Sequence, residues 1–206
     1  MSLDIDVYYS QLSPWAYIGH AELLRIAAAH RVKLNWRPVS LMEVFPESGG
    51  LPLSKRHPSR QRYRILELQR WREKRELNFN IHPQFWPFDP TLADCVACAL
   101  AAEGVDPQAF IGASFVGTFE QQRNLADETI VAAILAESGY DSSWLEKGKR
   151  PEAHAAYHAN RDIGLAAGVF GSPSYVLNGE VFWGQDRLDL LNDALTSGRK
   201  SFSPEA

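Results

Sequence analysis

A serine at the predicted start of a helix is the first feature of this sequence that could do chemistry. Residues 7–13 are an apolar run and a short turn, and Pro14 and Trp15 follow. Serine is a favoured N-cap and proline suits the first helical turn, so we expect a helix to begin at Pro14. An anion beside Ser13 would be stabilised by free backbone N–H groups at the positive end of that helix. Most serines in this setting only cap, so the tetrapeptide 13–16 does not distinguish the two roles.

A second candidate lies far downstream, where a proline opens a predicted hairpin. Asn178-Gly179 separates two β-rich runs, which is the strongest short-range signal for a hairpin. Pro173 begins the first of these strands, and a bond preceding proline is the usual place for a cis peptide. We predict that Ser172-Pro173 is cis, which would turn the Ser172 backbone outward, free to pair with an extended peptide. The alternative is an ordinary proline entering a hairpin.

Four stretches together resemble the DsbA-like thioredoxin superfamily, and within it the 2-hydroxychromene-2-carboxylate isomerases and kappa-class glutathione transferases. They are the strand and turn through Trp15, residues 36–38, residues 168–173 and residues 182–188, and their order holds over nearly the whole chain. In thioredoxin-like proteins Cys-x-x-Cys stands where this chain has Ser13 and Ala16. A hydroxyl cannot exchange disulfides, but it can hydrogen-bond a thiolate that glutathione brings.

The resemblance implies glutathione as the cofactor and gives residues their roles. The serine matching Ser13 supports the glutathione thiolate, Ser172 pairs with the tripeptide backbone, and the region of Gln185 and Asp186 holds the γ-glutamyl end. The expected catalytic residue is Ser13, and the expected glutathione-binding residues are Ser13, Trp15, Ser172, Pro173, Gln185 and Asp186. Asp89 stands where the family often has Asn, which leaves the exact substrate open.

Several of these residues also have plainer interpretations. The local pattern at Asp186 supports two roles equally, the N-cap of the last helix and ligand binding. Aromatic side chains that would suit a flat ligand are expected near a cleft; they are Trp15, Tyr17, Phe85, Trp86 and Phe88. A substrate carboxylate could be held by Arg37 or by a cation of the basic region 55–64, and the sequence does not choose among them. Most of the basic run 55–75 is expected to be a solvated helix face.

Composition narrows the class of protein. The chain has 206 residues, a net charge of −4, 45% hydrophobic and 22% charged residues. That length suits one domain with an inserted subdomain, and the acidic balance argues against a nucleic-acid partner. No apolar run reaches the roughly 18 residues of a membrane span, and the N-terminus shows no secretory signal. We therefore expect a cytoplasmic protein without a membrane partner.

The two cysteines form a Cys-x-x-Cys pair, Cys95 and Cys98, which invites a redox or metal interpretation. The surrounding residues 91–102 are typical of a helix interior, not of a strand-to-helix turn. No second pair exists to complete a zinc site. Buried, unreactive thiols are the favoured interpretation, and no metal is expected.

The predicted fold is α/β, thioredoxin-like (DsbA-like), with a large all-helical insertion between its βαβ and ββα halves. Strands are expected near 4–10 and 33–39 around a helix 14–30, with a right-handed crossover. A long loop rich in proline and glycine follows Pro38, residues 59–167 are helical with breaks, and a last helix covers 186–195. Residues from Ser197 are expected to be disordered. The thioredoxin-like domain would comprise 1–40 and 168–206, and the insertion 41–167.

The leading functional hypothesis is a glutathione-dependent isomerase of the 2-hydroxychromene-2-carboxylate type, acting as a homodimer on a small unsaturated aromatic keto acid. The resemblance implies reversible addition of the thiolate, rotation and elimination. Alternatives are a kappa-like glutathione transferase or peroxidase, and a non-catalytic DsbA-like binding protein. A disulfide oxidoreductase is weaker, because Ser13 replaces the nucleophile.

Overall fold

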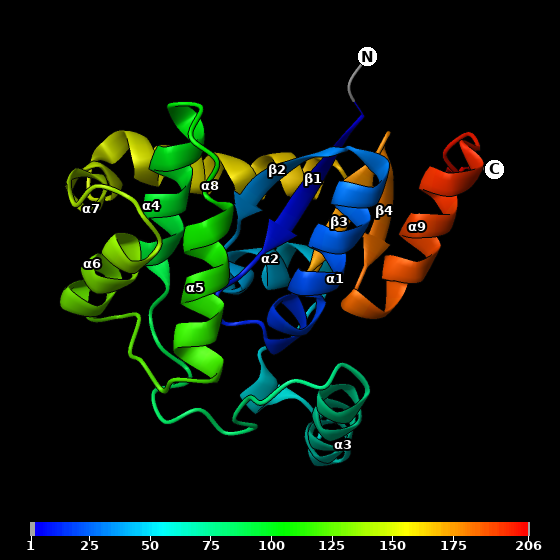
Figure 1. Ribbon diagram of the computed structural model, residues 1–206. Helices are drawn as coiled ribbons and strands as arrows, with labels where there is room; N and C mark the ends of the chain where they lie inside the picture. Colours follow the sequence, from blue (N-terminus) through cyan, green and yellow to red (C-terminus); the bar gives the residue numbers. More distant parts are fainter. Residues whose placement is uncertain (1–2, 206) are drawn as a thin grey trace.

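A mixed four-stranded sheet forms the centre of the computed structural model, which describes residues 3–205 (Figure 1). Its strands are β1 (Asp4–Tyr9), β2 (Lys33–Pro38), β3 (Ser174–Leu177) and β4 (Glu180–Trp183), in the order β2-β1-β3-β4. β1 pairs in parallel with β2, so that Tyr8 lies opposite Arg37, and antiparallel with β3. This confirms the predicted βαβ start and the return of the chain to a hairpin.

The hairpin turn forms as the sequence predicts. Asn178 and Gly179 have φ angles of 50° and 84°. Two successive positive φ values are the mark of a type I′ turn, whose twist matches that of the strands it joins. The turn therefore fixes the register in which β3 pairs with β4, and with it the place of Pro173 at the head of β3.

Helices cover both faces of the sheet. On one face lie α1 (Pro14–His30) and α9 (Leu188–Ser197), and on the other lie α2 (Leu41–Ser48) and α8 (Pro151–Ala166) (Figure 1). The close approach of α8 depends on a glycine, because a Cβ at Gly164 would lie 2.9 Å from the Tyr8 ring. The remaining helices are α3 (Pro58–Lys74), α4 (Thr91–Ala102), α5 (Gln108–Phe119), α6 (Glu128–Glu137) and α7 (Ser143–Gly148).

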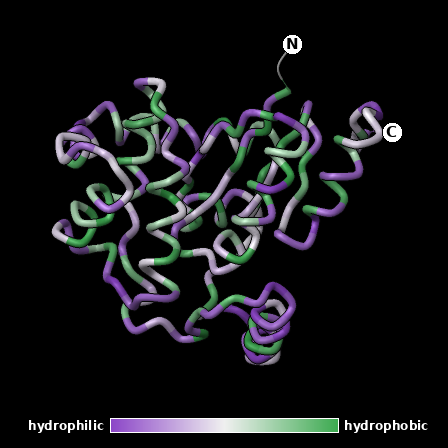
Figure 2. Tube along the Cα trace, in the orientation of Figure 1, coloured by the Kyte–Doolittle hydropathy of each residue, from purple (hydrophilic) through white to green (hydrophobic). Residues whose placement is uncertain are grey.

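One large hydrophobic core joins the sheet to the helical region. Ile5 and Val7 of β1 share it with α1 and with Phe110 and Phe115 of α5. Figure 2 shows that α3 is more hydrophilic than the helices around the sheet, although its Leu68 is buried in the same core. Burial of the aromatic and aliphatic side chains is the main stabilising term of such a core. No helix within residues 3–205 is long and apolar enough to cross a membrane.

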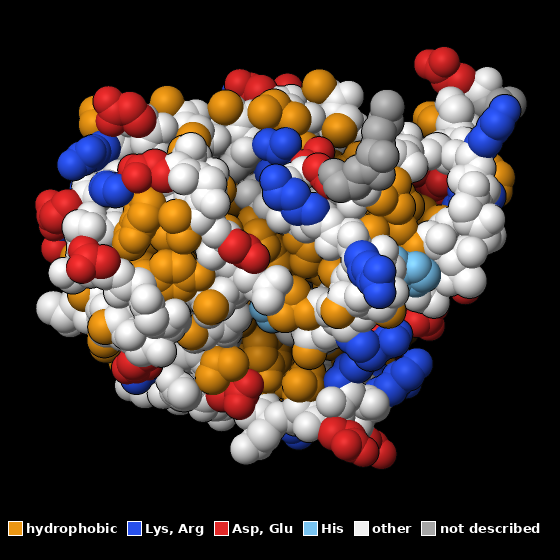
Figure 3. All heavy atoms as spheres, turned by 45° about the horizontal axis from the view of Figure 1, so that its top comes forward, with side chains coloured by type: hydrophobic (Ala, Val, Ile, Leu, Met, Phe, Trp, Pro, Cys, Tyr) orange, Lys and Arg blue, Asp and Glu red, His pale blue; other side chains and the backbone are white. Residues whose placement is uncertain are grey.

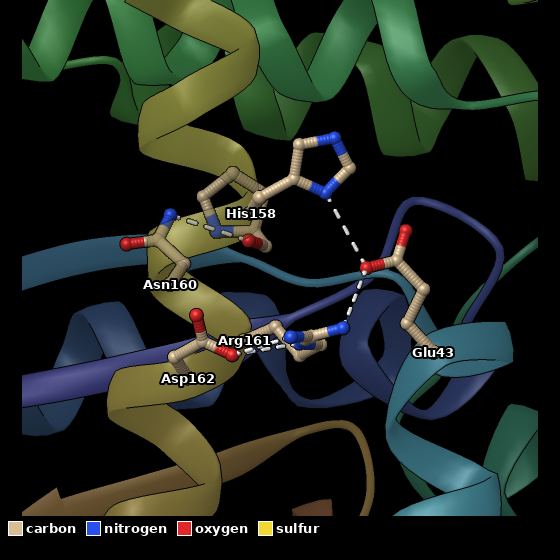
Figure 4. Close-up of polar contacts among 6 residues, drawn as sticks. Glu43, His158, Asn160, Arg161 and Asp162 are labelled. Atoms are coloured by element: carbon tan, nitrogen blue, oxygen red, sulfur yellow. Dashed lines mark hydrogen bonds and ion pairs between the residues drawn. The ribbon is translucent and has the colours of Figure 1, made fainter.

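The segment after Pro38 corrects the sequence prediction in part, because residues 41–48 form α2 and the expected loop covers only the residues that follow, including Gly49 to Pro52. Figure 4 shows what fixes α2: Glu43 contacts His158 at 3.3 Å and Arg161 at 3.5 Å, both on α8. Asn160 of the same helix donates to the Pro38 carbonyl at 3.3 Å, which anchors the end of β2. These contacts are tertiary, so the local composition of the segment did not reveal them.

Two further expectations are wrong. Residues 75–90, where breaks were expected only at 82–83 and 87–90, contain no helix at all. The C-terminal residues also differ from the predicted disorder. α9 runs through Ser197, and beyond it Arg199 makes a two-pronged ion pair with Glu180 of β4 at 2.8 Å. The backbone N–H of Phe202 also donates to Glu180 at 3.0 Å, so the tail lies along the edge strand.

Candidate active site

Ser13 begins α1, as predicted. The backbone N–H of Ser13 donates to the Ser10 carbonyl at 2.9 Å, which closes the turn after β1. Ser13 has extended backbone angles and its Oγ accepts the Ala16 N–H at 3.2 Å, which is the geometry of an N-cap. Pro14 occupies the first helical position. The side chain is 4% exposed, so its hydroxyl works in surroundings largely without water.

The two motifs from opposite ends of the chain meet here. The Ser172-Pro173 peptide is cis, as predicted. Ser13 Oγ donates to the Ser172 carbonyl at 3.2 Å, and Ser172 Oγ accepts the Ser10 N–H at 2.9 Å. Ser172 is therefore bound to the loop that carries Ser13 through two separate hydrogen bonds.

This contact modifies one expectation. The Ser172 backbone is not wholly free for a peptide ligand, because its carbonyl already accepts from Ser13. Within residues 3–205 the backbone N–H of Ser172 donates no hydrogen bond. The N–H of Trp15, in the first turn of α1, donates none either. The free N–H of Trp15 and the Ser13 hydroxyl thus lie at the positive end of α1, with Ser172 beside them. Such an arrangement can stabilise an anion.

The remaining predicted ligands occupy different surroundings. Trp15 is partly buried and packs against the main core. Gln185 is 2% exposed and lies against α1, where a Cβ at Gly19 would come within 2.7 Å of the Gln185 Cβ. Pro173 is buried, and its carbonyl accepts the Gly184 N–H at 2.8 Å, so the segment before Gln185 is tied to the cis-proline.

Asp186 is not a helix N-cap, contrary to one of its two expected roles. It lies inside a short 3₁₀ turn, η2 (Gln185–Arg187), which precedes α9, and the residue at the cap position of α9 is Arg187. The carboxylate is 45% exposed and pairs with the Arg187 side chain at 3.0 Å. It is thus open to solvent, and its role as a ligand for an ammonium group stays a prediction.

The predicted cleft aromatics divide into two groups. Tyr17 belongs to the core: it is 6% exposed, packs against Phe79 and Phe119, and donates to Glu120 at 2.8 Å. Burial and that hydrogen bond raise the pKa of its phenol. Trp86, by contrast, lies at the site. Its indole N–H donates to the Leu12 carbonyl at 2.9 Å, directly before Ser13.

The structure shows two features of the segment 86–91, the hydrogen bonds of Asp89 and a second cis peptide bond. Asp89 accepts from the Thr91 N–H at 3.0 Å and from the Thr91 hydroxyl at 2.6 Å. These bonds lower the pKa of Asp89, so that it opens α4 as a carboxylate. The Trp86-Pro87 peptide is cis. Proline at position 87 was the only signal for the cis bond, whereas Asp89 two residues before Thr91 is a spacing that favours the side-chain bond to the backbone.

A model of the DSBA-like thioredoxin domain matches residues 4–196. The chain belongs to this family. Its sheet, with the cis-proline at the head of β3 beside the start of α1, is the DsbA-like thioredoxin fold that the sequence predicted. The proposed division into 1–40 with 168–206 and 41–167 stays a prediction.

Curated relatives within this family carry one name. A 2-hydroxychromene-2-carboxylate isomerase from Sphingobium xenophagum is 26% identical over 198 residues, which cover 95% of this chain and 99% of the relative. Another 2-hydroxychromene-2-carboxylate isomerase, from Pseudomonas sp. (strain C18), is 24% identical over 93% of this chain and 89% of the relative. The solved structure of an HCCA isomerase has a TM-score of 0.80 at 22% identity, with 95% of both chains covered. The homologues are thus isomerases at modest identity.

The cysteine pair of this DsbA-like chain is not at the redox position. Cys95 and Cys98 lie within α4, 0% and 4% exposed, as expected. Burial and the neighbouring Asp94 raise the pKa of Cys95 to about 12 and that of Cys98 further. Thiols in this state are poor nucleophiles. A separate groove of about 680 Å³ runs along the edge strand β2, between the last turns of α1 and the turn after α4, and Figure 3 shows hydrophobic side chains in a hollow of this face.

Proposed function

We propose that this protein is a glutathione-dependent isomerase that acts on an unsaturated aromatic keto acid. The observation that carries the proposal is the meeting of Ser13 and Ser172 at the start of α1, in a chain whose curated relatives are 2-hydroxychromene-2-carboxylate isomerases over nearly their whole length. A serine in this place can hold a thiolate and cannot form a disulfide. The proposed cofactor is therefore a thiol that comes from outside the chain.

The residues at the site fit a glutathione molecule. The free N–H of Ser172 can pair with the carbonyl of an extended peptide, and the free N–H of Trp15 lies at the positive end of α1. The exposed Asp186 carboxylate follows a segment tied to Pro173 and can accept from an ammonium group. A protein of the same fold, the cytosolic disulfide reductase DsbM from Pseudomonas aeruginosa, has a solved structure with GSH, at 16% identity and a TM-score of 0.68.

Bound glutathione would supply a thiolate whose reversible addition turns a double bond into a rotatable single bond. The part played by the chain is to hold that thiolate. The Ser13 hydroxyl donates a hydrogen bond to the Ser172 carbonyl at 3.2 Å, which is long for a hydroxyl donor. A charged sulfur is the stronger acceptor, so the hydroxyl would turn toward it. The N-terminus of α1 would lower the pKa of the thiol further.

The experiment uses dialysed protein with 2-hydroxychromene-2-carboxylate as substrate, and follows its absorbance with and without glutathione. The proposal predicts conversion with glutathione and none with S-methylglutathione, which has the same peptide but no free thiol. Equal conversion without any thiol would contradict the role of the cofactor. Absence of conversion in all samples would favour a DsbA-like binding protein.

A further inference from the structure

Three arginines at or just before the start of α3 belong to the unpaired cations of the basic region, which within residues 3–205 also include Lys55, Arg62, Arg72 and Lys74. Arg70 pairs with Glu67 at 2.5 Å, and Arg75 pairs with Glu22 at 3.4 Å. Arg56, Arg60 and Arg64 have no such partner: within residues 3–205, no carboxylate oxygen lies within 4.0 Å of their guanidinium nitrogens. The positive charge of this arginine cluster, Arg56, Arg60 and Arg64, is not neutralised by the chain.

Arg64 links this cluster to the site. Its guanidinium carbon lies 5.2 Å from the centre of the Trp86 ring, so the cation stacks on the indole. The same indole donates to the carbonyl of Leu12 at 2.9 Å, and Leu12 directly precedes Ser13. The positive charge is thus placed one side chain away from the loop that carries the proposed thiolate site.

The charged form of the Arg64 guanidinium is destabilised in the absence of an anion. Burial and the nearby charge of Arg56 lower its pKa to about 10. Arg56 is itself crowded by Arg60, and its Nε donates to the Leu51 carbonyl at 2.8 Å, which holds it in place. Partly buried guanidiniums with like-charged neighbours gain most when an anion arrives.

The other cation that the sequence offered is already neutralised. Arg37 lies on β2, and its Nε is 3.0 Å from the Asp6 carboxylate on the neighbouring strand. A second carboxylate would have to compete with that ion pair. The ion pair therefore disfavours Arg37 against the cations of the region 55–64, a choice that the sequence left open.

We propose that Arg64, stacked on Trp86 and supported by Arg56, is the residue that binds the carboxylate of the substrate. A guanidinium presents two parallel N–H groups to a carboxylate, which fixes the orientation of the acid as well as its position. The identity of the ligand as the substrate rests on the proposed isomerase function. In this arrangement the substrate would lie with its carboxylate at Arg64 of α3 and its aromatic part directed toward the Ser13 loop.

The test measures binding and not turnover, so its failure can be told from a failure of the isomerase function. Titration calorimetry uses cinnamate, an unsaturated aromatic acid, and the uncharged cinnamamide, with protein free of glutathione. In Arg64→Met the dissociation constant for cinnamate should rise roughly 10- to 100-fold, as expected for loss of hydrogen bonds to a charged group. The dissociation constant for cinnamamide should stay unchanged.

Arg62→Met is the matched control, because Arg62 is an exposed arginine of the same helix. It should leave cinnamate binding unchanged. Arg64→Lys keeps the charge and should weaken cinnamate binding less than Arg64→Met, which gives a second variant if the methionine protein does not fold. Titration of the same variants with S-methylglutathione shows whether Arg64 binds a carboxylate of the substrate or one of glutathione.

Three results would overturn the proposal. The first is no binding of cinnamate by the unaltered protein, and the second is an equal loss of cinnamate affinity in Arg62→Met and Arg64→Met. The third is an Arg64→Met protein that loses S-methylglutathione binding and keeps its affinity for cinnamate. The last would assign Arg64 to the cofactor. Absence of isomerisation with normal cinnamate results would leave Arg64 as a carboxylate site and remove only the function on which its biological ligand depends.

Discussion

Replacement of Ser13 by alanine separates the structural and chemical roles of this side chain. Its Oγ caps α1 through the Ala16 N–H at 3.2 Å and donates to the Ser172 carbonyl at 3.2 Å. Loss of an N-cap costs about 1 kcal/mol, and loss of one further hydrogen bond costs about 1 kcal/mol. The free energy of unfolding should therefore fall by roughly 2 kcal/mol, which lowers Tm by about 4–8 °C in a chain of this size.

Turnover should fall by more than stability alone explains. Loss of one oriented donor in a buried site lowers the rate roughly 10- to 1000-fold, and glutathione affinity should fall less. The assay is the initial rate at saturating glutathione, well below the Tm of the variant. Asp127→Ala is the matched control, because Asp127 caps α6 through the Thr129 N–H at 2.8 Å. It should lose similar stability and keep its rate. An unchanged rate in Ser13→Ala would refute the role of the hydroxyl.

Three further predictions follow from single residues. Asp186→Asn should raise the Kd for glutathione roughly 10- to 100-fold, and it should leave Tm unchanged because the carboxylate is 45% exposed. The control Asp189→Asn should change neither quantity. Equal glutathione affinities of the two variants in calorimetry would remove Asp186 from the site. Cys95 and Cys98 should not react with a thiol reagent at pH 8 until the protein unfolds, since both are buried and their pKa values are raised; rapid labelling of native protein would disprove this. Burial lowers the pKa of His20 to about 4, so the unfolded chain binds more protons between about pH 6.5 and 4, and the free energy of unfolding should fall as the pH drops through that window, by on the order of 2 kcal/mol at pH 5. Urea unfolding at pH 7 and pH 5 checks this against His20→Phe, which should lack that part of the loss; the same loss in both proteins would rule His20 out as its source.

The parts of the fold that local chemistry specifies were predictable. Ser13 and Pro14 mark the start of α1, and Asn178-Gly179 marks the hairpin, because each depends on the backbone angles that these residues favour. The helix α2 was missed. Its segment contains Pro46 and ends at Gly49, and the contacts that fix it come from α8. A helix held by tertiary contacts leaves little signal in its own residues.

The site shows the same division. The position of Ser13 and the cis bond before Pro173 follow from local sequence and from the family resemblance. The interpretation of Asp186 as a cap was wrong, because a 3₁₀ turn separates it from α9. The stacking of Arg64 on Trp86 joins two segments that no local pattern connects. The choice between Arg64 and Arg37 required the ion pairs of the folded chain.

A crystal structure with glutathione bound tests the central claim most directly. The account predicts that the sulfur lies within hydrogen-bond distance of Ser13 Oγ, that the Ser172 N–H donates to the peptide, and that the bond from Ser13 to the Ser172 carbonyl is lost. The contrary result is glutathione bound with its sulfur away from Ser13 and with the 3.2 Å bond to Ser172 intact.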